Sequence, residues 1–123
     1  MEHRGLLDYR ATGDLYRSSD VGLALTVSKH PSYLPLELMA CGVPVVAFDN
    51  PWGHWLLRDE ENSLLARRTV VDIADALERL CRDTLLRERL AAQGLADIAA
   101  RHSDWDTALS GVHGWLTDPE GEA

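Results

Sequence analysis

One segment near the middle of the chain most constrains the fold. It begins with an apolar run, residues 22–27, continues through a polar loop, and ends in a second apolar run, residues 43–48. Short apolar runs bounded by turn residues are typical of buried strands. Between them, Pro35 suits the first turn of a helix, where its missing N–H is not needed. Gly42 suits the left-handed position that ends a helix, so the segment predicts strand, loop, short helix (35–41) and strand.

The loop between the two predicted strands is a candidate binding site. A loop that leaves the carboxyl end of a parallel strand and opens a helix is where α/β sheets bind ligands. The first N–H groups of such a helix, together with its dipole, favour a phosphate. Glu37 falls in the first turn, where its carboxylate can accept hydrogen bonds from sugar hydroxyls. The pattern therefore favours a ligand that carries both phosphate and hydroxyl groups.

The predicted helix and second strand also carry the motif of a known family. Residues 36–47 read L-E-L-M-A-C-G-V-P-V-V-A. This run resembles the donor-binding motif of retaining GT-B glycosyltransferases of the family 4 type, usually S-x-x-E-G-F-G-L-P-L-L-E-A-M-A-C-G-x-P-V-V-A. Residues 30–37, H-P-S-Y-L-P-L-E, are more similar to the WsaF-type rhamnosyltransferase branch. Weaker similarity at residues 15–23 and 102–105 extends the resemblance over residues 5–116.

The resemblance implies a function and a donor. It implies that a sugar, rhamnose in this branch, moves from a nucleoside diphosphate to an acceptor glycan without a metal or other cofactor. Loop N–H groups would hold the leaving diphosphate, where negative charge grows in the transition state. The motif assigns no catalytic residue to this chain. The candidate donor-binding residues are Lys29, His30, Ser32, Tyr33, Leu34 and Glu37.

Three of these residues have competing interpretations. Glu37 matches the second glutamate of the motif, which implies a ribose ligand; the alternative is an acidic residue that the helix dipole favours. Lys29 stands eight residues earlier, where the family has its first glutamate. It would meet the diphosphate as a point charge or remain a solvated loop lysine. His30 would bind a phosphate or sugar, or serve the structure of the loop.

The rest of the loop contributes through its backbone. The N–H groups of Ser32, Tyr33 and Leu34 are candidates for binding the diphosphate, whatever their side chains. The ring of Tyr33 either packs or stacks on a ligand. Trp52 and Trp55 follow in the next loop, on the same side of the sheet. They would line an acceptor or sugar pocket, or form a hydrophobic patch that another domain covers.

Flanking patterns predict further elements. Thr12 is a candidate cap for a helix over residues 13–18. A turn-rich loop follows the second strand, then a short helix over residues 54–58 and a third strand over residues 63–66. The last part of the chain is predicted to be helical.

Three helices are expected in that last part. Thr69 followed by Asp72 resembles a capping box, and a helix over residues 85–101 comes next, with Gly94 weakening its middle. Ser103 and Asp106 are expected to open the last helix, with its tryptophans as packing anchors. The apolar face of the first helix is formed by Ile73, Leu77, Leu80 and Cys81, that of the second by Leu86, Leu90 and Ile98, and that of the third by Trp105, Leu109, Val112 and Leu116.

This order of elements predicts an α/β fold. It is that of the carboxyl half of a doubly wound, Rossmann-like GT-B domain with a helical C-terminal tail. We expect residues 1–117 to form this partial nucleotide-sugar-binding domain and residues 118–123 to be disordered. The missing first half would leave residues 22–27 as an unpaired edge, which invites self-association. An N-terminal GT-B domain outside the chain would supply the other wall of the cleft.

Composition limits the partners. The chain has 123 residues and a net charge of −8, which argues against nucleic acid and anionic membranes. No apolar run approaches the roughly 20 residues of a membrane span, and no signal peptide is visible, so we expect a cytoplasmic protein. Cys41 and Cys81 lack the spacing of zinc ligands and are expected to be reduced and buried. The alternative to the donor site of a glycosyltransferase is a non-catalytic nucleotide-binding or interaction module.

Overall fold

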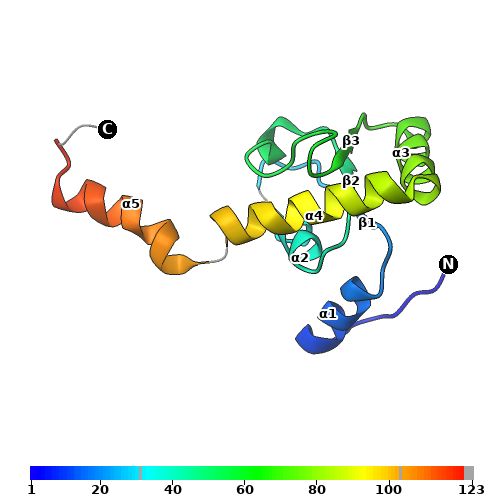
Figure 1. Cartoon of the computed structure of the whole chain (residues 1–123), viewed down its shortest axis with the longest axis horizontal. Coiled ribbons are helices and arrows are strands. Elements are labelled where there is room, and N and C mark those ends of the chain that lie inside the picture. The colour runs from blue at the N-terminus through cyan, green and yellow to red at the C-terminus, as the bar shows by residue number, and fades with distance from the viewer. Residues whose placement is uncertain (31, 103, 121–123) are drawn as a thin grey trace.

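A three-stranded parallel sheet organises the chain (Figure 1). Its strands are β1 (Gly22–Ala24), β2 (Val45–Phe48) and β3 (Leu64–Ala66), in the spatial order β1-β2-β3. The computed structural model describes residues 1–30, 32–102 and 104–120. Helices pack on both faces of the sheet, so the predicted α/β fold is confirmed.

The strands are shorter than predicted, most of all β1. Its ladder with β2 ends at the pair Ala24 and Ala47, although the apolar run continues to residue 27. Beyond that point the carbonyl oxygens of Thr26 and Ser28 accept hydrogen bonds from the Asn50 side chain. Backbone groups that are satisfied by a side chain no longer need a strand partner. Among the described residues, β1 has one neighbouring strand, so the predicted open edge is present.

Two hydrophobic clusters fix the helices to the sheet. The central strand β2 contributes to both, because Val45 and Ala47 face one side and Val46 faces the other. Helix α2 (Leu34–Ala40) covers the first face through Leu38 and Met39. Helix α3 (Val70–Arg82) and the first half of α4 (Thr84–Arg101) cover the second, mainly through Leu80, Leu86 and Leu90.

Helix α4 runs across the molecule and packs against α2 with its second half (Figure 1). Gly94 lies at this contact and is buried. A Cβ atom there would stand 3.2 Å from Cε and 3.3 Å from Cγ of Met39. The glycine that weakens the helix in isolation thus permits the two helices to approach closely.

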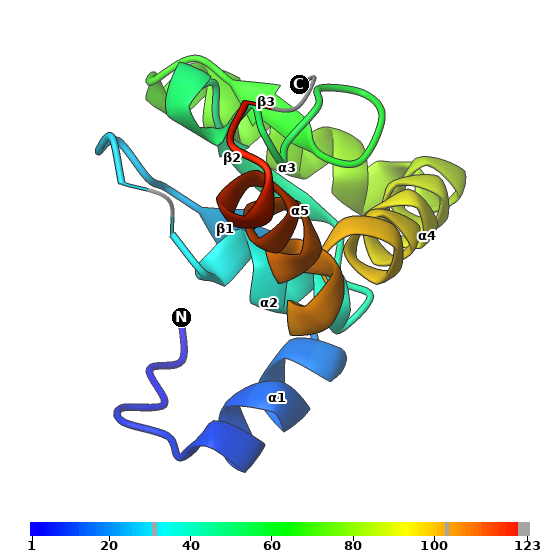
Figure 2. The ribbon, with the colours of Figure 1, turned by 90° about the vertical axis from the view of Figure 1, so that its left-hand side faces the viewer.

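The N-terminal helix begins earlier than predicted. Helix α1 covers Tyr9–Arg17 and is capped by Asp8, whose carboxylate accepts from Ala11 N at 2.7 Å. Thr12 lies inside the helix, and its hydroxyl donates to the Asp8 carbonyl oxygen. The prediction of Thr12 as the cap was wrong because Asp8 offers an equally good acceptor one turn earlier. Figure 2 shows α1 below α2, outside the layers of the sheet.

The segment after β2 also differs from the prediction. A 3-10 helix, η1, covers Pro51–Gly53, and residues 54–56 form a turn in place of the helix predicted over residues 54–58. The Asn50 side chain caps η1 by accepting from Trp52 N, and Pro51 suits its first position. Gly42 has φ +72°, which confirms the left-handed stop after α2.

Two local expectations hold only in part. Thr69 caps α3 by accepting from Asp72 N at 3.1 Å, but the Asp72 carboxylate pairs with Arg67 rather than closing the box. Cys81 is exposed and Cys41 is half-buried, both as free thiols. Cys81 was expected inside, yet it lies about 100° around the helix from Leu80, which fills the core position.

The last helix projects away from the sheet (Figure 1). Helix α5 covers Trp105–Thr117 and is capped by Asp104, which accepts from Asp106 N; Ser103 and the side chain of Trp105 lie outside the described parts. Trp115 is 66% exposed, so its prediction as a packing anchor was wrong. The apolar residues of this helix, namely Leu109, Val112 and Leu116, are likewise exposed. Asp118 ends α5, while residues 121–123 of the predicted tail are outside the described parts.

Candidate functional site

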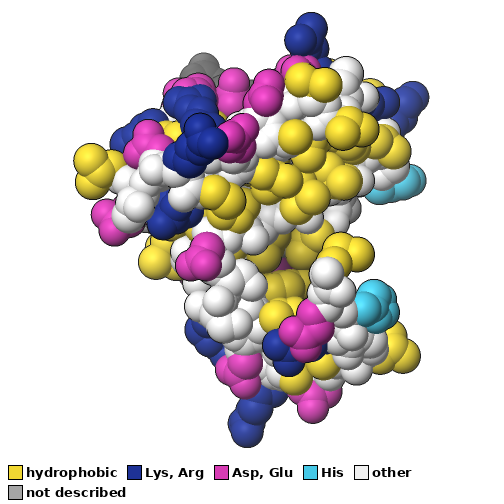
Figure 3. Space-filling model, turned by 90° about the vertical axis from the view of Figure 1, so that its right-hand side faces the viewer, with side chains coloured by type: hydrophobic (Ala, Val, Ile, Leu, Met, Phe, Trp, Pro, Cys, Tyr) yellow, Lys and Arg dark blue, Asp and Glu magenta, His cyan; other side chains and the backbone are white. Residues whose placement is uncertain are grey.

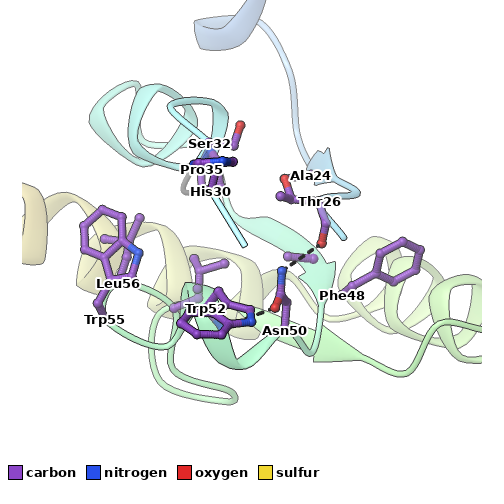
Figure 4. Close-up of a pocket in the computed structure, with 13 residues that line it drawn as sticks. Ala24, Thr26, His30, Ser32, Pro35, Phe48, Asn50, Trp52, Trp55 and Leu56 are labelled. Atoms are coloured by element: carbon purple, nitrogen blue, oxygen red, sulfur yellow. Dashed lines mark hydrogen bonds between the residues drawn. The ribbon is translucent and has the colours of Figure 1, made fainter. Parts of the chain in front are cut away.

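The first of two hollows lies at the carboxyl ends of β1 and β2; we call it the loop hollow. The segment after β1 forms one side, with His30, Ser32 and Pro35, and the segment after β2 forms the other (Figure 4). Its cavity volume is about 40 Å³, whereas a cavity needs roughly 10–15 Å³ to hold one water. The cavity therefore has room for a few water molecules.

Asn50 links the two sides of the loop hollow. Its Nδ2 donates to the carbonyl oxygens of Thr26 at 3.3 Å and Ser28 at 3.0 Å, and its Oδ1 accepts from Trp52 N at 3.2 Å. The side chain is buried, and Figure 4 shows it at the end of the hollow nearest the strands. Buried amides in good geometry fix the segments they bond. Asn50 therefore holds both segments in their present arrangement.

Two half-exposed tryptophans stand at the mouth of the loop hollow. Trp52 is 56% exposed and Trp55 is 45% exposed. The Lys29 Nζ lies 5.6 Å from the centre of the Trp52 ring, within range of a cation–π interaction. The His102 ring meets Trp55 edge-on, with 5.4 Å between the ring centres. Both indole rings thus have a neighbour that restricts their orientation.

The second hollow lies between α1 and α2; we call it the α1–α2 hollow. Its cavity volume is about 390 Å³, within the range of about 300–1,000 Å³ for small-molecule sites. Figure 3 shows an opening between the lower part of the molecule, which contains α1, and the upper part. Its walls combine aromatic, cationic and acidic side chains. They include Tyr9, Arg10, Tyr16, Arg17, Glu37 and Cys41.

Glu37 acts on its neighbours in this hollow. Burial, and after it the negative charge of Glu37, raises the pKa of the Tyr16 phenol above its usual range. Tyr16 therefore stays protonated near neutral pH and can donate a hydrogen bond. Tyr16 also packs against the core cluster below α2, so it connects α1 to the body of the domain.

The structure separates the predicted site residues into two groups. His30 and Ser32 line the loop hollow, and Lys29 lies over Trp52 beside it. Glu37 lies in the α1–α2 hollow instead. Between the two groups, Tyr33 caps α2 without a side-chain bond and Leu34 begins the helix.

Tyr33 and Leu34 differ in their surroundings. Tyr33 is 77% exposed, which contradicts the packing alternative, whereas Leu34 packs against the core cluster. The Leu34 N–H donates to the Ser32 hydroxyl at 3.2 Å. This N–H can reach a diphosphate only after the Ser32 side chain turns away.

A buried polar cluster supports the segment after β2. Asn62 is 1% exposed; its Nδ2 donates to the Leu56 carbonyl oxygen and to Asp97 Oδ2, and its Oδ1 accepts from Arg58 N. Asp97 also accepts from Arg58 and Gln93. Burial opposes the charge of Asp97, yet the bonds from Asn62, Gln93 and Arg58 hold the pKa of its carboxyl below the usual range. The cluster thus ties α4 to the loop that carries Trp55.

Sequence reasoning missed the residues that shape the hollows. Asn50 directly precedes Pro51 and Trp52, and asparagine before a proline is a known turn signal that could have revealed its capping role. Tyr16 and Arg17 were matched to the family only as part of its helix. Their place opposite Glu37 depends on how α1 packs on α2, which no local pattern contains.

The described residues contain neither a group of side chains that could hold a metal nor a helix that could span a membrane. In residues 1–30, 32–102 and 104–120, no three His, Cys, Asp or Glu side chains come together as a metal site. None of the helices in these same parts is both long and apolar enough to cross a membrane.

Comparison with known proteins links this geometry to a family. Residues 1–78 match the family described as WsaF, C-terminal domain. The chain is 42% identical over 108 residues to the O-antigen biosynthesis protein RfbC of Myxococcus xanthus, covering 88% of the chain and 8% of that protein. It is 36% identical over 110 residues to phosphatidyl-myo-inositol mannosyltransferase of Mycobacterium leprae, covering 88% of the chain and 29% of the relative.

Solved structures agree with this fold. The C-terminal domain of the group 1 glycosyl transferase LpcC from Francisella tularensis gives a TM-score of 0.66 at 25% identity, over 79% of this chain and 50% of that one. Anabaena HepE, solved with UDP and glucose, gives 0.68 at 24% identity, over 84% and 28%. The chain therefore belongs to the WsaF C-terminal domain family and has the fold of the C-terminal domains of GT-B glycosyltransferases.

Proposed function

We propose that this chain provides the nucleotide-sugar donor site of a glycosyltransferase that builds a glycan. The observation that carries the proposal is the α1–α2 hollow, in which Glu37 faces Tyr16 and Arg17. A carboxylate accepts hydrogen bonds from both hydroxyls of a ribose, and tyrosine rings offer flat surfaces for a base. The nucleoside would occupy this hollow.

The diphosphate would lie between the two hollows. Lys29, His30 and Ser32 lie at the loop hollow, and Tyr33 and Leu34 lead along the chain from it into α2, which carries Glu37. Hydrogen-bond donors aimed at developing negative charge are a major source of catalysis. The UDP and glucose bound to Anabaena HepE support a donor of this chemical class, and the family branch supports rhamnose as its sugar.

The chain spans 8% and 29% of the two relatives, so the activity of a whole enzyme is part of the proposal. We infer that a second domain supplies the opposite wall of the cleft and the acceptor site. Transfer without a bound metal, a cytoplasmic location and self-association through the β1 edge remain predictions from the sequence.

Nucleotide titration followed by backbone amide NMR tests the donor site. dTDP, UDP and GDP at millimolar concentration are expected to shift amides of residues 28–40 and of α1. Glu37→Gln should weaken nucleotide binding by about 1–3 kcal/mol, the range for a hydrogen bond to a charged group. Glu88→Gln, an exposed change on α4, is the matched control. Unmoved amides with all three nucleotides would show that the donor site is wrongly assigned.

A further inference from the structure

Tyr16 has a fixed place in the wall of the α1–α2 hollow. Its ring packs against the hydrophobic cluster that contains Leu38 and Met39, and the residue also lines the hollow itself. A tyrosine side chain has only two χ angles, so packing of the ring also restricts where its hydroxyl group lies. The Tyr16 hydroxyl is therefore held in place by contacts outside the hollow.

Glu37, on the facing helix α2, has no such support. The residue is exposed, and within the described ranges its carboxylate forms no ion pair. Arg17 lines the same hollow, but its guanidinium is already held by Asp14 at 2.5 Å. A long, flexible glutamate side chain loses much conformational entropy when it is fixed. To bind a ligand hydroxyl in one orientation, the carboxylate therefore needs a neighbour that orients it.

The Tyr16 phenol is the neighbour that the hollow provides. Both groups line the hollow, and the negative charge of Glu37 contributes, after burial, to raising the pKa of Tyr16. The phenol stays protonated near neutral pH, so it presents an O–H group to the carboxylate. A carboxylate has two oxygens that accept hydrogen bonds. A donor on one of them leaves the other for a hydroxyl of the ligand.

We propose that Tyr16 is the positioning residue of the nucleoside site: its phenol O–H donates to one Glu37 oxygen and turns the other toward the 3′-hydroxyl of the bound nucleoside. The role rests on the proposed function, which places the nucleoside in this hollow. Ribose and deoxyribose both carry a 3′-hydroxyl, so the contact serves UDP, GDP and dTDP alike. Tyr16 acts through Glu37 and determines how well that carboxylate recognises the sugar of the nucleoside.

The affinity ratio of two nucleotides isolates this contact. dTDP carries the 3′-hydroxyl, and its 2′,3′-dideoxy analogue, ddTDP, lacks it, while the base and the diphosphate are the same. Each is titrated into the 123-residue chain and followed by backbone amide NMR. We expect the parent chain to bind dTDP more tightly than ddTDP by about fivefold or more, because the analogue lacks a hydrogen bond to a charged acceptor. Tyr16→Phe, which keeps the ring and its packing, should reduce this ratio to below about two.

Two further variants define the expected pattern. Glu37→Gln should reduce the ratio as Tyr16→Phe does, and the double variant should reduce it no further, because both changes act on one contact. Ser18→Ala is the matched control: it removes a hydroxyl at the end of α1 that donates to the Leu15 carbonyl oxygen, and it should leave the ratio unchanged. A general loosening of α1 would weaken both nucleotides equally and would also leave the ratio as it was.

The role of Tyr16 is overturned if the ratio survives in Tyr16→Phe but is lost in Glu37→Gln, and the nucleotide site then stands. A ratio near one in the parent chain also overturns it, because Glu37 then does not bind the 3′-hydroxyl, although nucleotide binding itself stands. If neither nucleotide shifts the amides of residues 28–40 or of α1, the proposed donor site is wrong as well. Should Tyr16→Phe fail to fold, Tyr16→Leu removes the same hydroxyl while keeping an apolar side chain, and the same criteria apply.

Discussion

The segments that follow β1 and β2 leave the same edge of the sheet but are held to very different degrees. In residues 25–33, leaving aside position 31, no side chain is buried. In residues 49–63, Asn50, Leu56, Leu57, Asn62 and Ser63 are buried, and the Asn62–Asp97 cluster anchors the segment to α4. The hollow between them therefore has one wall with few anchors and one wall with many. We expect a ligand to move the first and to find the second already formed.

The largest effect is expected from removing the anchor of the second wall, which is the segment after β2. Asp97→Ala takes one partner from a part-buried ion pair, leaves Gln93 without this acceptor and leaves Asn62 Nδ2 with the Leu56 carbonyl oxygen alone. We expect the free energy of unfolding to fall by about 3 kcal/mol, measured by urea denaturation. Glu88→Ala, on an exposed position of the same helix, should change it by less than about 0.5 kcal/mol. Equal losses in both variants would mean that the cluster is not an anchor.

The same anchor should respond to acid. The pKa of Asp97 is held down against burial by Asn62, Gln93 and Arg58, so its contribution to stability is complete above the ordinary aspartate pKa of about 3.9. That contribution is lost as the pH falls through the folded value. The difference in unfolding free energy between the parent chain and Asp97→Asn should shrink over this acidic interval. A difference that stays constant down to the acid limit would contradict the assignment.

The link between the walls is the next target. Asn50→Ala removes the donor to Thr26 and Ser28 and the acceptor for Trp52 N. We expect a loss of about 1–2 kcal/mol in unfolding free energy, because three part-buried hydrogen bonds of the buried Asn50 side chain are lost. Amide hydrogen exchange should quicken around residues 26–28 and at Trp52. Asn50→Asp keeps the acceptor but loses the donor, so only the Trp52 amide should stay protected from hydrogen exchange. If residues 26–28 also stay protected in that variant, the link through Asn50 is refuted.

The smallest effect is expected in the first wall itself. Ser32→Ala removes only the acceptor of the Leu34 N–H, at a cost of about 0.5 kcal/mol in unfolding free energy. Since that N–H would then be free to bind a diphosphate, nucleotide affinity should not fall. Calorimetric titration with dTDP measures it. A marked loss of affinity would instead assign the Ser32 hydroxyl itself to the ligand.

Local signals in the sequence predicted the parts of the fold that local chemistry determines. Gly42 ends α2 because the backbone there takes a left-handed conformation, which glycine adopts readily. Thr69 caps α3 with its own hydroxyl. Contacts between distant residues carried no such signal. Asn62 and Asp97 are 35 residues apart, and Asp8 replaced Thr12 as a cap because both residue types fit that role.

The candidate site follows the same division. The motif identified the loop and Glu37, but it could not show that Glu37 faces α1 while His30 and Ser32 face η1. That separation depends on helix packing. Asn50 donates to the backbone carbonyl oxygens of Thr26 and Ser28. Every residue carries such a carbonyl, so the identity of residues 26 and 28 could not have predicted the contact.

The two free thiols, Cys41 and Cys81, can together report whether a ligand occupies the α1–α2 hollow. Cys41 lines the α1–α2 hollow and is half-buried, whereas Cys81 is exposed on α3, on the opposite face of the sheet from α2. A thiol reagent would therefore modify Cys81 at a rate set by solvent and Cys41 at a rate set by access to the hollow. The ratio of the two rates, read by mass spectrometry from a single sample, reports how often a ligand fills the α1–α2 hollow.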